Sequence, residues 1–217
     1  MQLYSASEMQ GTDDQRRAAR RSEILAAACR CFARDGFHAT SMADIIEEAG
    51  LSAGAVYRYF RGKDELIASV VETTIGTADE LFAELLDRDA TPPPDATVAF
   101  LIDAVLERAV NNPVTGVDMT RLALNAWAEA LRDRDVADHI ERTFTRFREF
   151  YAEVARRWQA AGDLDPAADP AQVGAVLMGL VHAFAIQRLL LSDTDPDKYL
   201  DGVRALLTSS ARRELDP

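Results

Sequence analysis

The fold of this chain is decided by residues 41–60, which read SMADIIEEAGLSAGAVYRYF. Ser41 and Asp44 have the spacing of a capping box, so they predict the start of a helix that Gly50 ends. Ser52 is suited to cap a second short helix that runs to Tyr59 or Phe60. Two short helices joined by a turn of three or four residues with a glycine in it form a helix-turn-helix. The apolar residues of the first helix recur at spacings of three and four and predict its buried face: Met42, Ile45, Ile46 and Ala49.

The second helix carries residues suited to contact DNA. Ala53 and Gly54 make its first turn small, which allows the backbone and the positive end of the helix dipole to come close to phosphate. Tyr57 and Tyr59 have hydroxyls that can bond phosphate oxygens, and Arg58 is long enough to bond guanine in the major groove. Each residue also has a structural interpretation, since Gly54 can serve close helix packing and one tyrosine can belong to the core.

The segment from Cys31 to Leu66 resembles the DNA-binding domain of the TetR family of bacterial transcriptional regulators. The resemblance covers about residues 18–78. Lys63, just beyond the motif, is predicted to be an unscreened point charge for phosphate, with a solvated surface residue as the alternative. The start of the family's first helix, which can lie along the DNA backbone, matches a basic cluster of Arg16, Arg17, Arg20 and Arg21. The ordered features that carry the resemblance are Phe32, Gly36, Thr40, Ile45, Ala49, Gly50, Ser52, Gly54, Tyr57, Phe60, Lys63 and Leu66. By position, the family's DNA contacts, mostly to phosphate, fall on Ser41, Ser52, Ala53, Gly54, Tyr57, Tyr59 and Lys63, with a base contact expected at Arg58.

Composition and charge agree with this organisation. The 217 residues carry a net charge of −12, but residues 1–63 carry +1 and the remainder −13. A near-neutral head on an acidic body is a reason to look for a nucleic-acid surface on the head. Apolar spacings of three and four throughout predict an all-α fold, in which an N-terminal helix-turn-helix domain precedes a larger helical domain. We expect a mobile extension over residues 1–17, the DNA-binding domain over 18–78 and an effector-binding and dimerisation domain over 79–217. The predicted helices span 14–35, 41–50, 52–60, 63–87, 95–111, 117–132, 135–161, 169–191 and 196–213.

The resemblance implies two functions for the acidic body. The last two helices of the family form a dimer seam, and a small effector binds among the middle helices. Because the candidate pocket residues are mainly apolar, a hydrophobic or aromatic effector is expected, with Trp127 as the strongest candidate contact. The predicted pocket residues are Phe100, Met119, Trp127, Phe144, Phe147, Tyr151, Met178 and His182. The predicted seam residues are Ala171, Gly174, Ala175, Met178, Gly179, His182, Ala183 and Leu206.

Other functions are disfavoured. The sequence predicts no enzymatic activity and no metal or cofactor site. Its three histidines are scattered, and it has no H-x-x-x-H or C-x-x-C motif and no glycine-rich phosphate loop. Cys29 and Cys31 are expected to pack inside a helix, in a chain that works in the reducing cytoplasm. The apolar stretch 173–191 is interrupted by His182, Gln187 and Arg188, so an interface helix is predicted in preference to a membrane span. The sequence therefore predicts a dimeric, ligand-responsive regulator of operator DNA, and the resemblance implies that it is a repressor, which is the tendency of the family. The alternative is a TetR-like protein that acts through a protein partner and has lost or altered its DNA binding.

Overall fold

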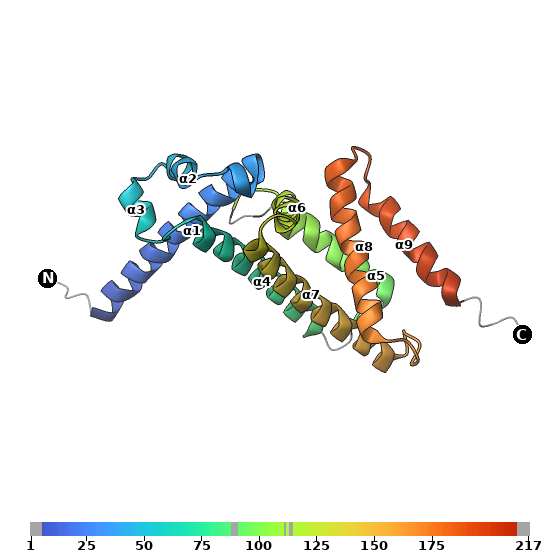
Figure 1. Ribbon diagram of the computed structural model, residues 1–217. Helices are drawn as coiled ribbons and strands as arrows, with labels where there is room; N and C mark the ends of the chain where they lie inside the picture. The colour runs from blue at the N-terminus through green and yellow to red at the C-terminus, as the bar shows by residue number, and fades with distance from the viewer. Residues whose placement is uncertain (1–5, 88–90, 111, 113–114, 212–217) are drawn as a thin grey trace, which may run out of the picture.

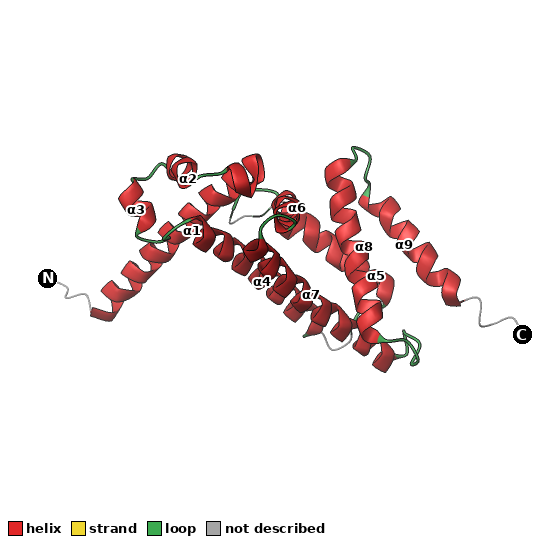
Figure 2. Ribbon diagram, in the orientation of Figure 1, coloured by secondary structure: helices red, strands yellow, loops and turns green. Residues whose placement is uncertain are grey.

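The computed structural model describes residues 6–87, 91–110, 112 and 115–211, and the described part is helical without a strand (Figure 2). The N-terminal end, which the sequence predicts to be the DNA-binding end, contains α1 (Ala6–Ala39), α2 (Met42–Ala49), α3 (Ala53–Tyr57) and the start of α4 (Lys63–Leu86). The remainder contains α5 (Pro94–Ala104), the π-helix η1 (Val105–Val110), α6 (Met119–Ala130), α7 (Arg134–Ala161), α8 (Pro170–Leu190) and α9 (Pro196–Ala211). The predicted all-α class is confirmed.

The helix boundaries differ from the prediction in two places. α1 begins at Ala6 and not near Asp14, because the polar segment before Asp14 has no proline to stop a helix. It is broken at Gly36, whose φ of 81° and ψ of 166° are not helical, and one more turn follows to Ala39. The single helix predicted for 95–111 divides into α5 and the π-helix η1.

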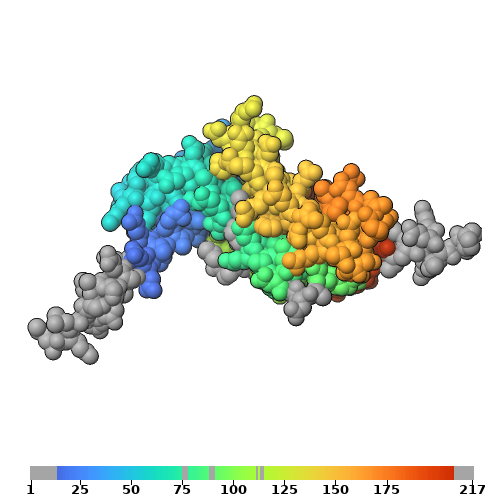
Figure 3. Space-filling model, turned by 90° about the horizontal axis from the view of Figure 1, so that it is seen from below, coloured from blue at the N-terminus to red at the C-terminus, as the bar shows by residue number. Residues whose placement is uncertain are grey.

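The helices form an elongated molecule with the short helices at one end and α8 and α9 at the other (Figure 1). α4 and α7 pack against each other along the middle, and α8 packs along α7. In the space-filling view the N-terminal helices form a blue-to-cyan lobe beside the yellow and orange helices (Figure 3). The long α4 is therefore the covalent connection between the two ends.

Two clusters of buried side chains hold these ends together. The first surrounds Phe32 and Phe60 in the N-terminal lobe, and it also takes in Met119, Leu122 and Ala126 of α6. The core of the DNA-binding end is therefore completed by a helix that lies far away in the sequence. The second cluster surrounds Trp158, Phe184 and Leu101 where α5, α7, α8 and α9 meet; its other buried members are Phe82, Leu85, Val98, Ile102, Tyr151, Val154, Ala155, Leu177, Val181, Leu200 and Val203.

Both cysteines are buried and free, as expected for residues that only pack. Burial raises the pKa of the Cys29 thiol to about 12, because the thiolate would lose its hydration. α8 is long and apolar enough to cross a membrane by length and composition alone. It packs along α7 and carries buried residues such as Leu177 and Phe184, which is the behaviour of a helix in a folded helical assembly.

Candidate DNA interface and effector cavity

The helix-turn-helix is held by local caps, as predicted. Ser41 Oγ accepts from the backbone N–H of Asp44 at 3.3 Å, and the Asp44 carboxylate accepts from the N–H of Ser41 at 2.7 Å. The bonds from Ser41 lower the pKa of the Asp44 carboxyl, because they stabilise its charged form. Gly50 ends α2 at φ 64°, a conformation that favours glycine. Ser52 then caps α3 by accepting from the N–H of Ala55. The capping-box prediction is confirmed in full.

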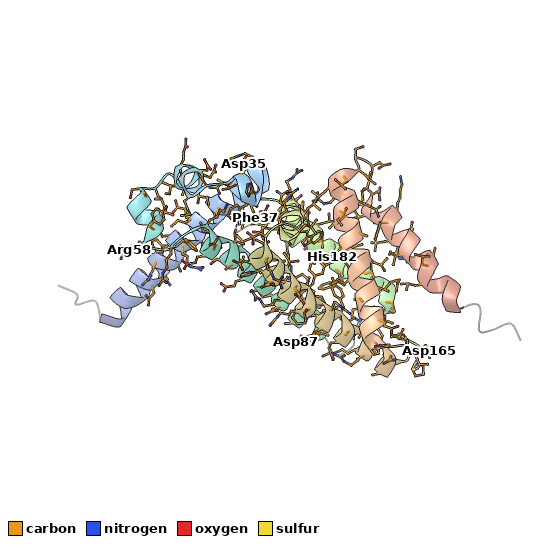
Figure 4. The ribbon with its side chains drawn as sticks, in the orientation of Figure 1. Asp35, Phe37, Arg58, Asp87, Asp165 and His182 are labelled. Carbon is orange, nitrogen blue, oxygen red and sulfur yellow. The ribbon has the colours of Figure 1, made fainter. Side chains whose placement is uncertain are left out.

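The predicted contact residues of α3 lie on an exposed face. Ala53, Gly54 and Arg58 are exposed and the Tyr57 side chain is 49% exposed, while Val56 is fully buried beneath them. A Cβ added at position 54 would meet nothing within 4 Å, so Gly54 is not there for packing within this chain. Figure 4 shows Arg58 at the end of the molecule far from His182. This face is small, polar and free of partners among the described residues.

Tyr59 differs from its neighbours. It is only partly exposed and packs against the N-terminal core cluster. The sequence left open that one of the two tyrosines is half core, and the structure identifies Tyr59 as that one.

Lys63 is not the unscreened charge that the sequence predicted. Its Nζ donates to the carbonyl oxygens of Phe37 at 2.9 Å and Thr40 at 3.2 Å. These carbonyls lie where α1 ends, and a helix C-terminus has carbonyls without helical partners and a negative dipole end. The ammonium group therefore ties the start of α4 to the end of α1. One of its three N–H groups remains for another acceptor.

Arg20 and Arg21 are also engaged within the chain. Arg20 pairs with Glu23 at 2.7 Å. Arg21 donates to Ser69 Oγ at 2.7 Å, and its guanidinium lies 4.8 Å from the ring centre of Phe60. Both arginines therefore have partners within the chain, and their contact with the DNA backbone stays a prediction.

Sequence reasoning missed a pair of arginines that orient α2 on α1. Arg30 donates to Glu48 at 2.6 Å and Arg34 donates to the other oxygen of the same carboxylate at 3.2 Å. The bond from Arg30, followed by that from Arg34, lowers the pKa of the Glu48 carboxyl. The i, i+4 spacing of the two arginines was the available signal, since it places both on one helix face.

A cavity of about 230 Å³ lies between the middle helices and reaches the DNA-binding end. Its wall at that end is Phe37, whose ring stacks on Phe32 at 4.6 Å and whose carbonyl binds Lys63. η1 contributes Val105, and π-helical turns are frequent at functional sites. The other walls come from α4, α5, α6, α7 and α8. The cavity therefore touches a residue that holds the helix-turn-helix in place.

Six of the eight predicted pocket residues line this cavity: Met119, Trp127, Phe144, Phe147, Tyr151 and His182. Phe100 and Met178 do not, and this part of the prediction is corrected. Both pack against the second core cluster around Trp158, because their faces of α5 and α8 turn away from the cavity.

An aromatic group forms around His182. Its ring centre lies 5.6 Å from that of Trp127, 5.4 Å from Phe144 and 6.4 Å from Phe147. The Nδ1 atom lies 2.8 Å from the carbonyl oxygen of Met178, one turn earlier on α8. Burial lowers the pKa of His182, and the bond to Met178 opposes that shift. His182 is therefore a neutral imidazole inside an apolar cavity at physiological pH.

Comparison with known proteins adds to this geometry. Residues 24–70 match the sequence family described as bacterial regulatory proteins, tetR family, and residues 94–212 match the BetI-type transcriptional repressor C-terminal family. The chain belongs to the TetR family. It is accordingly a DNA-binding transcriptional regulator.

Individual TetR-family relatives are distant. UidR of Escherichia coli (strain K12) is 25% identical over 193 residues, which cover 86% of this chain and 90% of UidR. YfiR of Bacillus subtilis (strain 168) is 29% identical over 149 residues, or 68% of this chain and 69% of YfiR. Among solved structures, Salmonella enterica GusR has a TM-score of 0.68 at 22% identity, over 88% of this chain and 94% of GusR. A transcriptional regulator from Saccharomonospora viridis, solved in complex with choline, has a TM-score of 0.68 at 20% identity over 87% of this chain and 95% of its own. Such similarity supports the fold and not a shared ligand.

The predicted dimer seam of this TetR-family chain divides between two faces of α8. Gly174 is buried against α7, where an added Cβ would lie 2.6 Å from the backbone nitrogen of Ala152. Met178 packs on the core and His182 lines the cavity, so these three seam assignments are corrected. They face their own chain because α7 and α8 pack closely. Of the remaining predicted residues, Ala171, Gly179 and Leu206 are exposed and Ala175 and Ala183 are half-buried.

The outward face of α8 and the end of α9 expose large apolar side chains, of which the predicted seam named Leu206 alone. Val176 is 67% exposed and Leu206 67%, and Leu190, Leu191 and Leu207 are also exposed. An apolar groove of about 270 Å³ lies beside Val176 and Leu207, and residues of α5, α7, α8 and α9 line it. The spacing of Val176, Gly179, Ala183 and Leu190 places them along one stripe of the helix.

Proposed function

We propose that this protein is a ligand-responsive repressor that binds a pseudo-palindromic operator as a homodimer in the cytoplasm and is released by a small hydrophobic effector. The single observation that carries the proposal is the cavity, which runs from Trp127 and Tyr151 in the body to Phe37 in the DNA-binding end. An occupant of this cavity contacts both the sensing helices and the wall that supports the helix-turn-helix.

The exposed face of α2 and α3 supplies the DNA contacts in this proposal. Tyr57 and the capping serines, Ser41 and Ser52, bond phosphate together with the backbone at Ala53 and Gly54, and Arg58 contacts base edges. Tyr59 contributes its hydroxyl from a half-buried position. Arg21 and Lys63 act chiefly by bracing the lobe, and the third N–H of Lys63 is available to a phosphate oxygen. Arg20 pairs with Glu23 on its own helix, stays at the surface and contacts the DNA backbone.

A second copy of this chain covers the exposed apolar face of α8 and α9. Large apolar side chains that gather on one exposed face, such as Val176, Leu190 and Leu206, are unfavourable in water and favour an interface. Two-fold symmetry brings the same face of each protomer together, so the two α3 helices become related by the same axis as an operator's half-sites.

Two connections carry the effector's influence to α3. α4 is the covalent one. α6 is the second, because Asn125 Nδ2 donates to the carbonyl oxygens of Phe32 at 3.0 Å and Ala33 at 3.4 Å in α1. Trp127, two residues along α6, lines the cavity. An effector that displaces α6 therefore moves α1 and changes the separation of the two α3 helices, which lowers operator affinity provided that the displaced shape binds DNA less well.

The test is selection of binding sites from a randomised DNA library with the purified protein, followed by footprinting and sedimentation. The expected result is one enriched motif with dyad symmetry, half-sites about one helical turn (~34 Å) or slightly more apart, and a stable dimer. A monomer at micromolar concentration would contradict the dimer. Failure to enrich any site would contradict operator binding and favour the alternative of a protein partner. An enzyme is not favoured by any feature of the cavity, and the named relatives are regulators.

A further inference from the structure

The cavity is apolar, but three polar groups on its wall have no bonded partner among the residues that the structure describes. They are the hydroxyl of Tyr151, the indole N–H of Trp127 and the Nε2 atom of His182. Tyr151 is only 4% exposed, and the apolar surroundings raise its pKa because they disfavour the phenolate. Buried polar groups are nearly always hydrogen-bonded, and leaving one unpaired is unfavourable. A ligand with matching groups satisfies them.

The bond of His182 to α8 fixes what its other nitrogen can do. A carbonyl oxygen only accepts, so the Nδ1 atom that lies 2.8 Å from the Met178 oxygen must carry the proton. In a neutral imidazole Nε2 is then an acceptor without a hydrogen. Because Nδ1 points back to its own helix, Nε2 at the far side of the ring points away from the α8 backbone and toward the aromatic group. Figure 4 shows His182 between α8 and the middle helices.

The charge of the wall selects against ions. No aspartate, glutamate or lysine is among the described residues that line the cavity, so a cationic ligand finds no counter-charge. Arg108 is the one charged residue among them, and its guanidinium is bonded to Glu84. That pair already neutralises the guanidinium charge, so a carboxylate ligand would have to share the cation with Glu84. Ions buried without a partner are strongly disfavoured, so the wall fits an uncharged molecule.

The size of the cavity limits that molecule. An engineered apolar cavity of about 150 Å³ binds benzene, and this cavity is about 230 Å³. The difference is suited to a second fused ring or a short side chain. The flat rings of Trp127, Phe144 and Phe147 provide surfaces against which an aromatic molecule packs.

We propose that the cavity selects an uncharged, mainly aromatic molecule of about bicyclic size whose hydroxyl group donates a hydrogen bond to Nε2 of His182. The hydroxyl of Tyr151 and the N–H of Trp127 then bond to whatever acceptors the molecule carries. This inference rests on the proposed role of the cavity as the effector site. It goes further by stating the charge, the size and the donor of the effector.

The test uses four naphthalene probes and isothermal titration calorimetry with DNA-free protein. The probes are 2-naphthol, its methyl ether 2-methoxynaphthalene, 2-naphthoate and 2-naphthyltrimethylammonium. We expect 2-naphthol to bind roughly tenfold more tightly than the ether, since the ether lacks one hydrogen bond whose net worth corresponds to about tenfold in affinity. Both charged probes are expected to bind at least tenfold more weakly than 2-naphthol.

Variants assign the preference to one atom. His182→Phe should bind 2-naphthol and the ether equally, whereas His182→Gln keeps an acceptor and should retain part of the preference. His139→Phe is the matched control, because Nδ1 of His139 also lies close to the carbonyl oxygen four residues earlier, at 2.7 Å, but the residue is outside the cavity. It should behave as the wild type.

Several results would overturn the inference: equal binding of 2-naphthol and the ether by the wild type, tightest binding of either charged probe, no binding of any probe up to its solubility, or a preference that survives in His182→Phe. The wild-type comparison decides even where a variant fails to fold. Site selection on DNA is a separate measurement. Probe binding without operator binding would therefore refute the proposed regulator and leave the selectivity of the cavity standing.

Discussion

Lys63 offers the sharpest test of how the DNA-binding end is assembled. Its ammonium group is the donor that the carbonyls of Phe37 and Thr40 share at the end of α1. Both of these residues are almost fully buried. Lys63→Met keeps the apolar stem and the helix but removes the donor, so both carbonyl oxygens lose a charged partner.

The magnitude follows from those two bonds. Hydrogen bonds to charged groups are worth about 1.5–3 kcal/mol each. Because Lys63 is only partly buried, water replaces part of the loss, and we expect the free energy of unfolding to fall by about 2 kcal/mol in total. If the third N–H of Lys63 also contacts phosphate, Lys63→Met should lower the number of ions released on operator binding by about two per dimer, one for each protomer.

The assay is urea unfolding followed by circular dichroism at one fixed protein concentration, because the stability of a dimer depends on concentration. Arg58→Met is the matched control, since it removes a cation from the same lobe at an exposed position. It should leave the free energy of unfolding within about 0.5 kcal/mol of the wild type while weakening operator binding. Wild-type stability of Lys63→Met would refute the bracing role, even if operator binding were lost.

Three further predictions follow from the body of the protein. Gly174→Ala should lower the free energy of unfolding by about 1–3 kcal/mol, since its methyl group meets the backbone of α7. The added methyl group of Gly179→Ala meets nothing within 4 Å, so this variant should keep the fold and change only the dimer dissociation constant. Equal thermal destabilisation of both variants would contradict the division of α8 into two faces. Ala123→Trp should fill the cavity and abolish 2-naphthol binding in calorimetry with the helical circular dichroism spectrum preserved, and unchanged 2-naphthol affinity would place the effector site elsewhere. Binding of 2-naphthol should also weaken as the pH falls through the lowered pKa of His182, because an imidazolium cannot accept a hydrogen bond from the hydroxyl group. The free energy of unfolding should decrease below about pH 6.5, because the imidazole of the unfolded chain is protonated before that of the folded chain. His182→Phe should reduce both pH effects.

The pH effect has few competing sources near the imidazole. The rings that face His182 from α6 and α7 belong to Trp127, Phe144 and Phe147, none of which titrates in this range. Within the described wall of the cavity, Arg108 is the one charged side chain, and its guanidinium is paired with Glu84. A residual pH dependence in His182→Phe would therefore report on groups outside the cavity.

The helix-turn-helix could be predicted from sequence because its determinants are local. The capping box joins residues three apart, Gly50 acts through its own φ, and Ser52 caps a helix that begins at the next residue. Caps and turns of this kind depend on a few neighbouring residues and little on the rest of the fold.

The bonds of Lys63, Arg21 and Asn125 could not be predicted in the same way. Lys63 reaches a carbonyl 26 residues away, Arg21 a hydroxyl 48 residues away and Asn125 a carbonyl 93 residues away. A cation that looks solvated in the sequence finds these partners only when α1, α4 and α6 pack together. Composition and spacing carry no information about which acceptors that packing leaves open.

The two tryptophans show the same limit for the cavity. An indole N–H needs a polar partner when buried, and this favoured Trp127 as the ligand contact, but the rule applies equally to Trp158. The structure separates them: Trp158 donates to the carbonyl oxygen of Pro92 at 2.8 Å, while Trp127 lines the cavity. The loop before α5 supplies the acceptor that makes Trp158 a core residue, whereas the N–H of Trp127 remains available to a ligand.

The small residues of α8 show why the dimer seam was assigned to too broad a surface. Gly174 and Gly179 are five residues apart, which is about 140° around a helix, so no single partner can approach both. A small residue indicates that another backbone comes close, but it does not indicate from which chain. Gly174 is occupied by α7 of its own protomer, and the open surface at Gly179 lies beside exposed Val176 on the outward stripe. The residues available to a second copy are therefore those whose side chains are small or apolar and that also face away from α7. They predict a seam centred on Val176, Gly179 and Ala183.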